Sequence, residues 1–306
     1  MSLLTNLLYP FERPAPPPAR TPMGFFTDTT LCIGCKACEV ACKQWNQLPS
    51  DGFLWTGDSY DNTGTLSATS WRHVAFIEQF SDGASPDAHN GSSGPAAFGA
   101  TQSPSGGFDL DALLSQAKDG RWLMMSDVCK HCSAAPCQIA CPTAAIIHNE
   151  FADVYIQNDI CNGCGYCVAA CPFGVITRNA IDGHAHKCTL CYDRQRDGLV
   201  PACAKACPTE SIQFGPIEEL RERARKRVAT LHQRGETDAY LYGDRPTDTY
   251  PSLHAFFLLL DEPSRYRLPD NPEMPQLHLA GDYLRAGIGA LLMFTAAIVA
   301  MMAYAV

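Results

Sequence analysis

The stretch Cys161-Asn-Gly-Cys164-Gly-Tyr-Cys167-Val-Ala-Ala-Cys171-Pro172 places four cysteines within eleven residues. Such thiols can form disulfides, a zinc site or an iron–sulfur cluster. Disulfide scaffolds are mostly short secreted domains, and structural zinc sites use two ligand pairs separated by a longer loop. The spacing C-x2-C-x2-C-x3-C-P is that of bacterial ferredoxins, where three thiolates bind one [4Fe–4S] cluster and the fourth binds another. The stretch therefore predicts iron–sulfur chemistry.

All sixteen cysteines of the 306-residue chain fall into four groups of four. The groups are Cys32, Cys35, Cys38 and Cys42; Cys129, Cys132, Cys137 and Cys141; Cys161, Cys164, Cys167 and Cys171; and Cys188, Cys191, Cys203 and Cys207. A proline follows each of the last three groups. Buried cysteines that act only as small hydrophobic residues would not be grouped in this way. At four thiolates per cluster, the chain is predicted to bind four [4Fe–4S] clusters.

The charge of the chain argues against nucleic acid as a partner. The formal net charge is −9 and the isoelectric point is about 5.4, whereas a nucleic-acid binder is usually basic. One basic run, residues 221–227, could form a phosphate-binding patch. However, Leu220, Ala224, Val228 and Leu231 form an apolar stripe at helical spacing around it. We interpret the run as the solvated face of a surface helix.

Outside the cysteine groups, composition divides the chain. Residues 1–23 are predicted to form a proline-rich arm, and residues 81–120 a Gly/Ser/Pro-rich insertion and linker. Residues 217–284 are predicted to hold the surface helix and a proline-rich connector. Short strands are expected at residues 144–149, 153–156 and 211–215.

The last part of the sequence predicts a transmembrane anchor at residues 285–306. Residues 286–306 carry no charge, and 21 helical residues span roughly 31 Å, close to the thickness of a bilayer core. The alternative is a buried core helix. An uncharged stretch of this length favours the membrane.

No set of residues predicts catalysis. The chain has no dinucleotide-binding fingerprint and no Cys-x-x-Cys-His haem motif. A row of clusters without a catalytic centre predicts an electron conductor whose redox partners lie on other chains. Two alternatives remain open: a membrane-tethered polyferredoxin without a catalytic partner, and a zinc-binding scaffold protein.

Three segments carry a family resemblance. TLCIGCKACEVACKQWN at 30–46, YDNTGTLSATSW at 60–71 and KCTLC at 187–191 resemble the iron–sulfur β subunit of membrane-bound respiratory formate dehydrogenase, in the four-cluster ferredoxin family of molybdopterin oxidoreductases. The resemblance runs from about residue 24 to the C-terminus. The proline-rich arm, the insertion and the end at Val306, where similar proteins carry a polar tail, depart from it.

The resemblance implies an α+β fold with two ferredoxin-like 2[4Fe–4S] units, inserted loops and one C-terminal transmembrane helix. Residues 24–80 and 181–216 would form the first unit from groups one and four, and residues 121–180 the second from groups two and three. The implied ligand sets are Cys32, Cys35, Cys38 and Cys207 (set 1); Cys42, Cys188, Cys191 and Cys203 (set 2); Cys129, Cys132, Cys137 and Cys171 (set 3); and Cys141, Cys161, Cys164 and Cys167 (set 4).

The same resemblance implies partners. A molybdenum- or tungsten-pterin α subunit, most simply one that oxidises formate, would supply electrons. A cytochrome b-type γ subunit in the membrane would receive them and reduce quinone. The alternative is the equivalent subunit of another molybdopterin oxidoreductase, such as one acting on sulfur compounds. Similar proteins have their clusters outside the cytoplasm, whereas the single Arg285 before the anchor favours the cytoplasmic side by the positive-inside rule.

Four lysines lie close to predicted ligands in the sequence: Lys36, Lys130, Lys187 and Lys205. A positive charge near a cluster stabilises its reduced state and raises its potential. Ordinary solvated lysines would explain the positions equally well, and the sequence leaves both interpretations open.

Overall fold

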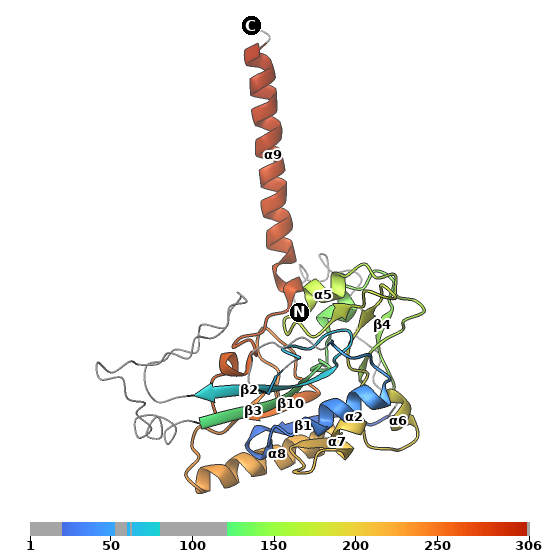
Figure 1. Ribbon diagram of the computed structural model, residues 1–306. Helices are drawn as coiled ribbons and strands as arrows, with labels where there is room; N and C mark the ends of the chain where they lie inside the picture. Colours follow the sequence, from blue (N-terminus) through green and yellow to red (C-terminus); the bar gives the residue numbers. More distant parts are fainter. Residues whose placement is uncertain (1–19, 53–59, 62, 80–120, 305–306) are drawn as a thin grey trace, which may run out of the picture.

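The computed structural model describes residues 20–52, 60, 61, 63–79 and 121–304 (Figure 1). The predicted N-terminal arm lies outside the described residues except for its last part, residues 20–23. The predicted insertion at 81–120 lies wholly outside them.

A four-stranded sheet in the order β8-β1-β10-β9 forms the centre of the body. Strand β1 (Met23–Asp28) runs parallel to β10 (Ala255–Leu259) and antiparallel to β8 (Ile212–Pro216). Strand β9 (Tyr240–Tyr242) lies antiparallel to β10 on its other side. The strand predicted at 211–215 is confirmed as β8, whereas β9 and β10 lie in the region expected to be a connector. Every side chain of β10 is at most 1% exposed, as expected for an apolar strand covered on both faces.

Helix α8 (Ile217–Gln233) packs on this sheet and confirms the predicted surface helix. Its stripe residues Leu220, Ala224 and Leu231 are buried, while four of its basic side chains pair with acidic groups. Arg227 Nε lies 2.8 Å from the buried carboxylate of Asp28. The same carboxyl group caps the 3-10 helix η1 (Thr29–Leu31) that leads to the first cysteine group. Arg227 of the basic run therefore ties α8 to the start of the first cysteine group.

Strands β2 (Arg72–Gln79) and β3 (Arg121–Val128) form a second, antiparallel sheet. The ladder starts with Arg72 opposite Val128 and ends with Gln79 opposite Arg121. Strand β3 follows directly after the insertion and pairs with a strand from before it, so the sheet joins the two expected units. Cys129 comes directly after β3, which places the second cysteine group at the end of this sheet.

Two small hairpins complete the cysteine-bearing region. Strands β4 (Ile146–His148) and β5 (Val154–Ile156) confirm the short strands predicted there, and they pair antiparallel with each other. Strands β6 (Thr177–Arg178) and β7 (Ala185–His186) form the second hairpin. These hairpins connect cysteine groups, and Ile146, Ile156 and Ala185 from their strands line one of the cysteine cavities.

Short helices carry five of the cysteines (Cys38, Cys42, Cys137, Cys167 and Cys203), and one more begins directly after Cys191. They are α2 (Ala37–Trp45), α4 (Pro136–Ile139), α5 (Tyr166–Ala170), α6 (Tyr192–Arg196) and α7 (Ala202–Lys205). Helices α2 and α7 pack against each other, which brings the first and fourth groups together (Figure 1).

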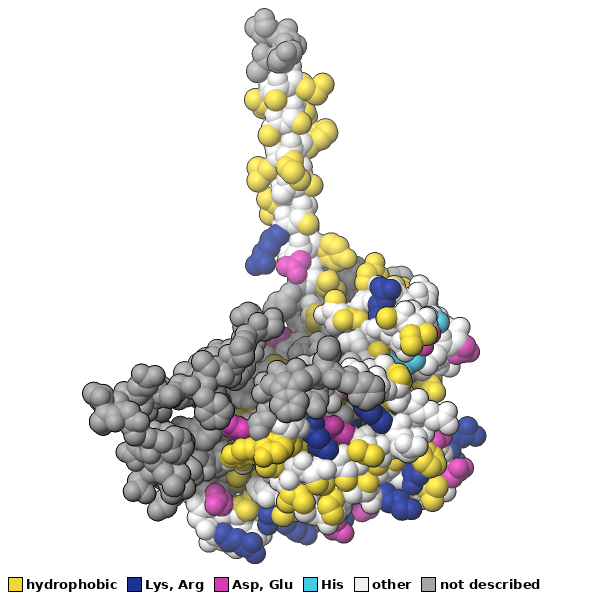
Figure 2. All heavy atoms as spheres, viewed as in Figure 1, with side chains coloured by type: hydrophobic (Ala, Val, Ile, Leu, Met, Phe, Trp, Pro, Cys, Tyr) yellow, Lys and Arg dark blue, Asp and Glu magenta, His cyan; other side chains and the backbone are white. Residues whose placement is uncertain are grey.

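Helix α9 (Leu279–Tyr304) projects alone from the body (Figure 1). Two 3-10 helices, η3 (Pro263–Tyr266) and η4 (Pro275–His278), precede it. Residues Gly281–Met302 are long and apolar enough to cross a membrane, and this stretch has no buried part. On the face in view in Figure 2, apolar side chains cover the helix and charged ones lie only at its base. There Arg285 Nη1 lies 3.4 Å from Asp282 Oδ1.

Candidate iron–sulfur sites

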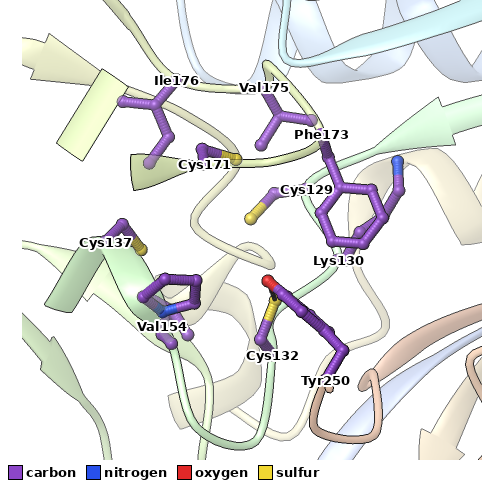
Figure 3. Close-up of a pocket in the computed structure, with 12 residues that line it drawn as sticks. Cys129, Lys130, Cys132, Cys137, Val154, Cys171, Phe173, Val175, Ile176 and Tyr250 are labelled. Carbon is purple, nitrogen blue, oxygen red and sulfur yellow. Dashed lines mark hydrogen bonds between the residues drawn. The ribbon is translucent and has the colours of Figure 1, made fainter. Parts of the chain in front are cut away.

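Three cavities in the body are each lined by four cysteines. Figure 3 shows one of them, where the sulfurs of Cys129, Cys132, Cys137 and Cys171 face a shared space. The remaining lining is mostly apolar, with Tyr250 and Lys130 at the side. The other two cavities are lined by Cys141, Cys161, Cys164 and Cys167, and by Cys32, Cys35, Cys38 and Cys207. In each case three cysteines come from one sequence group and one comes from another.

The four remaining cysteines also gather, between α2, α7 and the start of α6. Cys42, Cys188, Cys191 and Cys203 are each at most 7% exposed. Burial raises the pKa of Cys191 to about 12, and the neighbouring Cys203 thiolate adds to this effect. Burial raises the pKa of Cys42 as well, again with contributions from Cys203 and Cys191. Thiolates raise one another's pKa only when their sulfurs lie close together. The structure therefore brings these four cysteines together as well.

The donor set fits a [4Fe–4S] cluster. All sixteen cysteines are free, although many face one another. Burial raises the pKa of Cys132 to about 12 and that of Cys38 to about 12, so these thiols would stay protonated at neutral pH without a metal. Iron supplies the positive charge that a buried thiolate needs.

The sulfurs line cavities, whereas tetrahedral zinc would place four of them about 2.3 Å from one point. Among the described residues, no three Cys, His, Asp or Glu side chains are arranged to hold a single ion.

The backbone repeats one feature in all four groups. The residue before the second cysteine adopts a left-handed conformation, with φ of 65° at Gly34, 43° at His131, 70° at Gly163 and 54° at Leu190. Alternating right- and left-handed residues point successive N–H groups into a concave anion-binding site, which is common around iron–sulfur clusters. Consistent with this, the N–H of Leu190 donates to the sulfur of Cys188 at 3.3 Å. A glycine occupies this position in the first and third groups only, so the sequence indicates the left-handed conformation in just those two groups.

The prolines after the cysteines form a second repeated feature. In each Cys-Pro segment the residue three positions after the cysteine donates its N–H to the cysteine carbonyl, closing a β-turn with proline at its second position. The bonds join Ala144 to Cys141 (3.3 Å), Gly174 to Cys171 (3.2 Å) and Glu210 to Cys207 (3.3 Å). The donor residue has a positive φ in all three turns. The turn directs the chain away from the sulfur.

Two family models, both described as a 4Fe-4S dicluster domain, match residues 31–145 and 120–217. The chain is 36% identical over 256 residues to the formate dehydrogenase-O iron–sulfur subunit of Escherichia coli (strain K12), covering 81% of this chain and 71% of that protein. It is 37% identical over 251 residues to the formate dehydrogenase iron–sulfur subunit of Haemophilus influenzae, covering 81% and 68%. The chain belongs to the family of formate dehydrogenase iron–sulfur subunits.

Membership in this iron–sulfur subunit family confirms the resemblance seen in the sequence, and the role of the chain is electron transfer. The chain is also 30% identical over 203 residues to a component of the anaerobic dimethyl sulfoxide reductase of E. coli (strain K12), covering 66% of this chain and 78% of that protein. The mixed α/β body, the dicluster domains and the single apolar C-terminal helix agree with the expected fold class at this coarser level.

The family segment at 30–46 has a structural role in this iron–sulfur subunit. Asn46 at the end of α2 donates to the carbonyl of Cys42 at 2.9 Å. Trp45 Nε1 donates to Asp193 Oδ2 at 2.8 Å, and the Arg194 guanidinium lies 4.2 Å from the centre of its ring. These contacts tie the helix that bears Cys42 to the helix that follows Cys191.

The structure distinguishes among the four lysines. Lys130 and Lys187 are 1% and 3% exposed. Lys130 pairs with Asp127 and lies over the rings of Phe173 and Phe257. Lys187 donates to the carbonyls of Val154 and Cys188. These two are therefore part of the cysteine-bearing interior, whereas Lys36 is partly exposed and Lys205 exposed.

Sequence reasoning missed a third buried cation, Arg72. It begins β2, far in sequence from every cysteine, and only the folded chain places it among them. Burial lowers the pKa of Arg72, but the charges of the Cys203, Cys38 and Cys188 thiolates outweigh burial and raise it overall.

Proposed function

We propose that this chain is the electron-transfer subunit of a membrane-bound molybdenum- or tungsten-pterin oxidoreductase, with formate as the substrate of its catalytic partner. It would carry four [4Fe–4S] clusters and no catalytic residue of its own. The observation that carries the proposal is the gathering of sixteen free cysteines into four sets, three of them around cavities.

The ligands of the four clusters are proposed as the sets that the family resemblance implies. Set 1 is Cys32, Cys35, Cys38 and Cys207; set 2 is Cys42, Cys188, Cys191 and Cys203; set 3 is Cys129, Cys132, Cys137 and Cys171; and set 4 is Cys141, Cys161, Cys164 and Cys167. The cavity linings support sets 1, 3 and 4. The mutual effects of the thiolates support set 2. Sets 1 and 2 would form the first ferredoxin-like unit, residues 24–80 and 181–216, and sets 3 and 4 the second, residues 121–180.

We propose that the four sets form a row suited to electron conduction, on the basis of three links between them. Cys38 and Cys42 are one helical turn apart on α2, which joins sets 1 and 2. Cys188 of set 2 experiences the charge of Cys129 of set 3. Cys137 and Cys141 lie in and just after α4 and join sets 3 and 4. Since electrons tunnel quickly only across short gaps, we propose the order 1-2-3-4, with an exposed ligand at each end, Cys35 and Cys164.

The position of α9 suggests which end faces the membrane. In Figure 1, α5, the helix that contains Cys167 of set 4, lies near the base of α9, and α8 lies at the opposite side of the body. Gln276 of η4 donates to the carbonyl of Pro136 in α4 at 3.1 Å, which ties this base to the second unit. We therefore propose that α9 anchors the chain, that set 1 receives electrons from the catalytic subunit, and that set 4 delivers them to a cytochrome b-type membrane subunit that reduces quinone.

Iron analysis and partner identification test the function. The purified complex is expected to contain about sixteen irons in this chain, with matching acid-labile sulfide, and formate should bleach its visible absorption. A colourless zinc protein would refute the proposal. If clusters are present but the catalytic chain reduces a sulfoxide and ignores formate, the chain serves the reaction named for its dimethyl sulfoxide reductase relative. Isolation without any catalytic chain would favour a membrane-tethered polyferredoxin.

We place the cluster-bearing body on the extracytoplasmic face, because similar formate dehydrogenases export this subunit. The lone Arg285 before the uncharged stretch would favour the opposite side, but that rule weakens for large translocated domains. Protease added to intact spheroplasts should digest the body. Full protection, with digestion after lysis, would place it in the cytoplasm.

A further inference from the structure

Arg72 connects two cysteine sets through direct contacts. Its Nη2 donates to the sulfur of Cys203 in α7 at 3.2 Å. Its Nη1 donates to the carbonyl of Ser126 at 3.2 Å and lies 3.4 Å from the hydroxyl of the same serine. That hydroxyl is 3.2 Å from the sulfur of Cys38 in α2. The guanidinium thus touches a cysteine of set 2 directly and reaches a cysteine of set 1 through one hydroxyl group.

This guanidinium is a buried charge without a carboxylate partner in the part of the chain that the structure describes. Arg72 is 2% exposed, and its guanidinium carbon lies 4.8 Å from the centre of the Phe25 ring. No Asp or Glu of the described residues lies within ion-pair distance of it, and its Nε has no hydrogen-bond partner. An unpaired buried charge is strongly unfavourable. Its counter-charge must come from neighbouring anions, and the nearest candidates are the cysteine sulfurs.

The buried lysines differ from Arg72 in this respect. Lys130 has Asp127 as an acidic partner, and Lys187 donates to backbone carbonyls. In the described part of the chain, no charged side chain other than Arg72 donates a hydrogen bond to a cysteine sulfur. A guanidinium stays charged at all relevant pH values and presents donors in a rigid fork, so it can face two anionic groups at once.

We propose that Arg72 is the shared counter-ion of the clusters held by sets 1 and 2, and that it keeps the reduction potentials of both clusters high. The inference rests on the proposed ligand sets. Reduction adds one negative charge to a cluster, and a cation in a low-dielectric interior stabilises that charge more than it stabilises the oxidised state. Arg72 acts in this scheme through its charge, at the cysteine sulfur that it contacts. Its charge would raise the reduction potentials of the first two clusters of the path and leave those of sets 3 and 4 unaffected.

The test is a redox titration of the purified complex followed by electron paramagnetic resonance, after iron analysis. Arg72→Gln keeps a donor near Cys203 and Ser126 but removes the charge, and Arg72→Lys keeps the charge. With sixteen irons retained, the Gln variant should move two of the four reduction steps to lower potential and leave the other two in place. The Lys variant should restore both steps toward their original positions. Lys205→Met, at an exposed cation two residues from Cys207, should move none.

Each other outcome is decisive. A Gln variant with full iron and four unshifted steps would overturn the proposal and leave the ligand sets intact. A shift confined to one step would refute the sharing between two clusters. Loss of iron in both the Gln and the Lys variants would show a packing role in place of an electrostatic one. A wild-type complex that lacks the expected iron would instead refute the ligand sets themselves.

Discussion

Trp45 donates a hydrogen bond from its indole Nε1 to the carboxylate of Asp193 at 2.8 Å. The two residues lie 148 positions apart in sequence, one on the helix that bears Cys42 and the other in the helix after Cys191. This surface hydrogen bond therefore holds together two helices that position cysteines of the same proposed set. A family-typical tryptophan that is 44% exposed thus has a local structural explanation.

This relationship gives a graded prediction. Trp45→Phe removes the hydrogen bond and keeps a ring under Arg194, so it should cost about 1 kcal/mol of stability. Trp45→Ala also removes the ring and should cost about 2 to 3 kcal/mol. Thermal denaturation with iron release as the second signal would measure both. A Trp45→Phe variant as stable as wild type would contradict the role assigned to the hydrogen bond, and equal losses in both variants would contradict the role assigned to the ring. Asp193→Asn, which keeps an acceptor, is the matched control.

The three Cys-Pro turns allow a reciprocal test of backbone strain. Glu210 is exposed with φ of 53°, and Gly174 occupies the equivalent place in another turn with φ of 61°. Glu210→Gly should therefore stabilise the chain slightly, by up to about 1 kcal/mol, because the left-handed conformation disfavours side chains with a Cβ. Gly174→Ala should cost about 1 kcal/mol, since the space around Gly174 is open and only the backbone conformation penalises it. Melting curves showing the same sign for both changes would contradict this explanation.

The sequence predicted the features that depend on residues close together in the chain. The cysteine spacing, the strands β4, β5 and β8 and the apolar stripe of α8 all depend on residues close in sequence. Strand β10 was missed because its run of apolar residues has no alternation, and its partner β1 lies about 230 positions away. Arg72 was missed for a similar reason. Its significance depends on Cys203 and Ser126, which only the β2–β3 ladder and the α2–α7 packing bring to it.

The sequence also did not reveal every residue with a left-handed backbone conformation. Gly34 and Gly163 show the left-handed residue before the second cysteine, but His131 and Leu190 adopt the same conformation without a glycine. Both side chains are fully buried. Packing around them supplies the energy that offsets an unfavourable φ, and packing cannot be read from residue type at a single position.

Asp153 gives a pH-dependent prediction. Burial raises the pKa of its carboxyl group to about 7, although hydrogen bonds from Gln195 and Asn149 and the charge of Lys187 oppose the rise. Since the unfolded value is about 3.9, the folded chain binds the extra proton between about pH 4 and pH 7. Stability from this group is therefore fully present below about pH 4 and is lost as pH rises through about 7, by roughly 4 kcal/mol in total.

Asp153→Asn should remove this dependence. Relative to wild type, the variant should gain apparent melting temperature steadily from pH 5 to pH 7 and then keep a constant advantage at pH 8. The Asn side chain still accepts from Gln195, which donates to Asp153 Oδ2 at 2.7 Å in the native chain. A difference between the two proteins that stays the same from pH 5 to pH 8 would show that Asp153 is ionised throughout.

Removal of residues 279–306 tests the anchor. The body buries its core without α9, and the membrane-long stretch Gly281–Met302 has no buried part. The shortened chain should therefore fold, retain its iron and stay in solution, whereas the full chain partitions into lipid. Liposome flotation of the isolated subunit measures this without interference from partner subunits. If the shortened chain floats as the full chain does, another surface binds the membrane.

The exchange of cysteines between groups gives the most direct test of the proposed ligand sets. Cys207 and Cys203 are neighbours in sequence, but Cys207 lines the cavity of Cys32, Cys35 and Cys38, whereas Cys203 lies with Cys42 and Cys191. Cys207→Ala and Cys203→Ala should therefore disturb different clusters. Each variant should lose one electron paramagnetic resonance component and up to four of about sixteen irons. The component lost in Cys207→Ala should also be lost in Cys35→Ala, despite the distance in sequence. If Cys207→Ala and Cys203→Ala abolish the same component and Cys35→Ala a different one, the fourth group binds its own cluster and the exchange between groups is wrong.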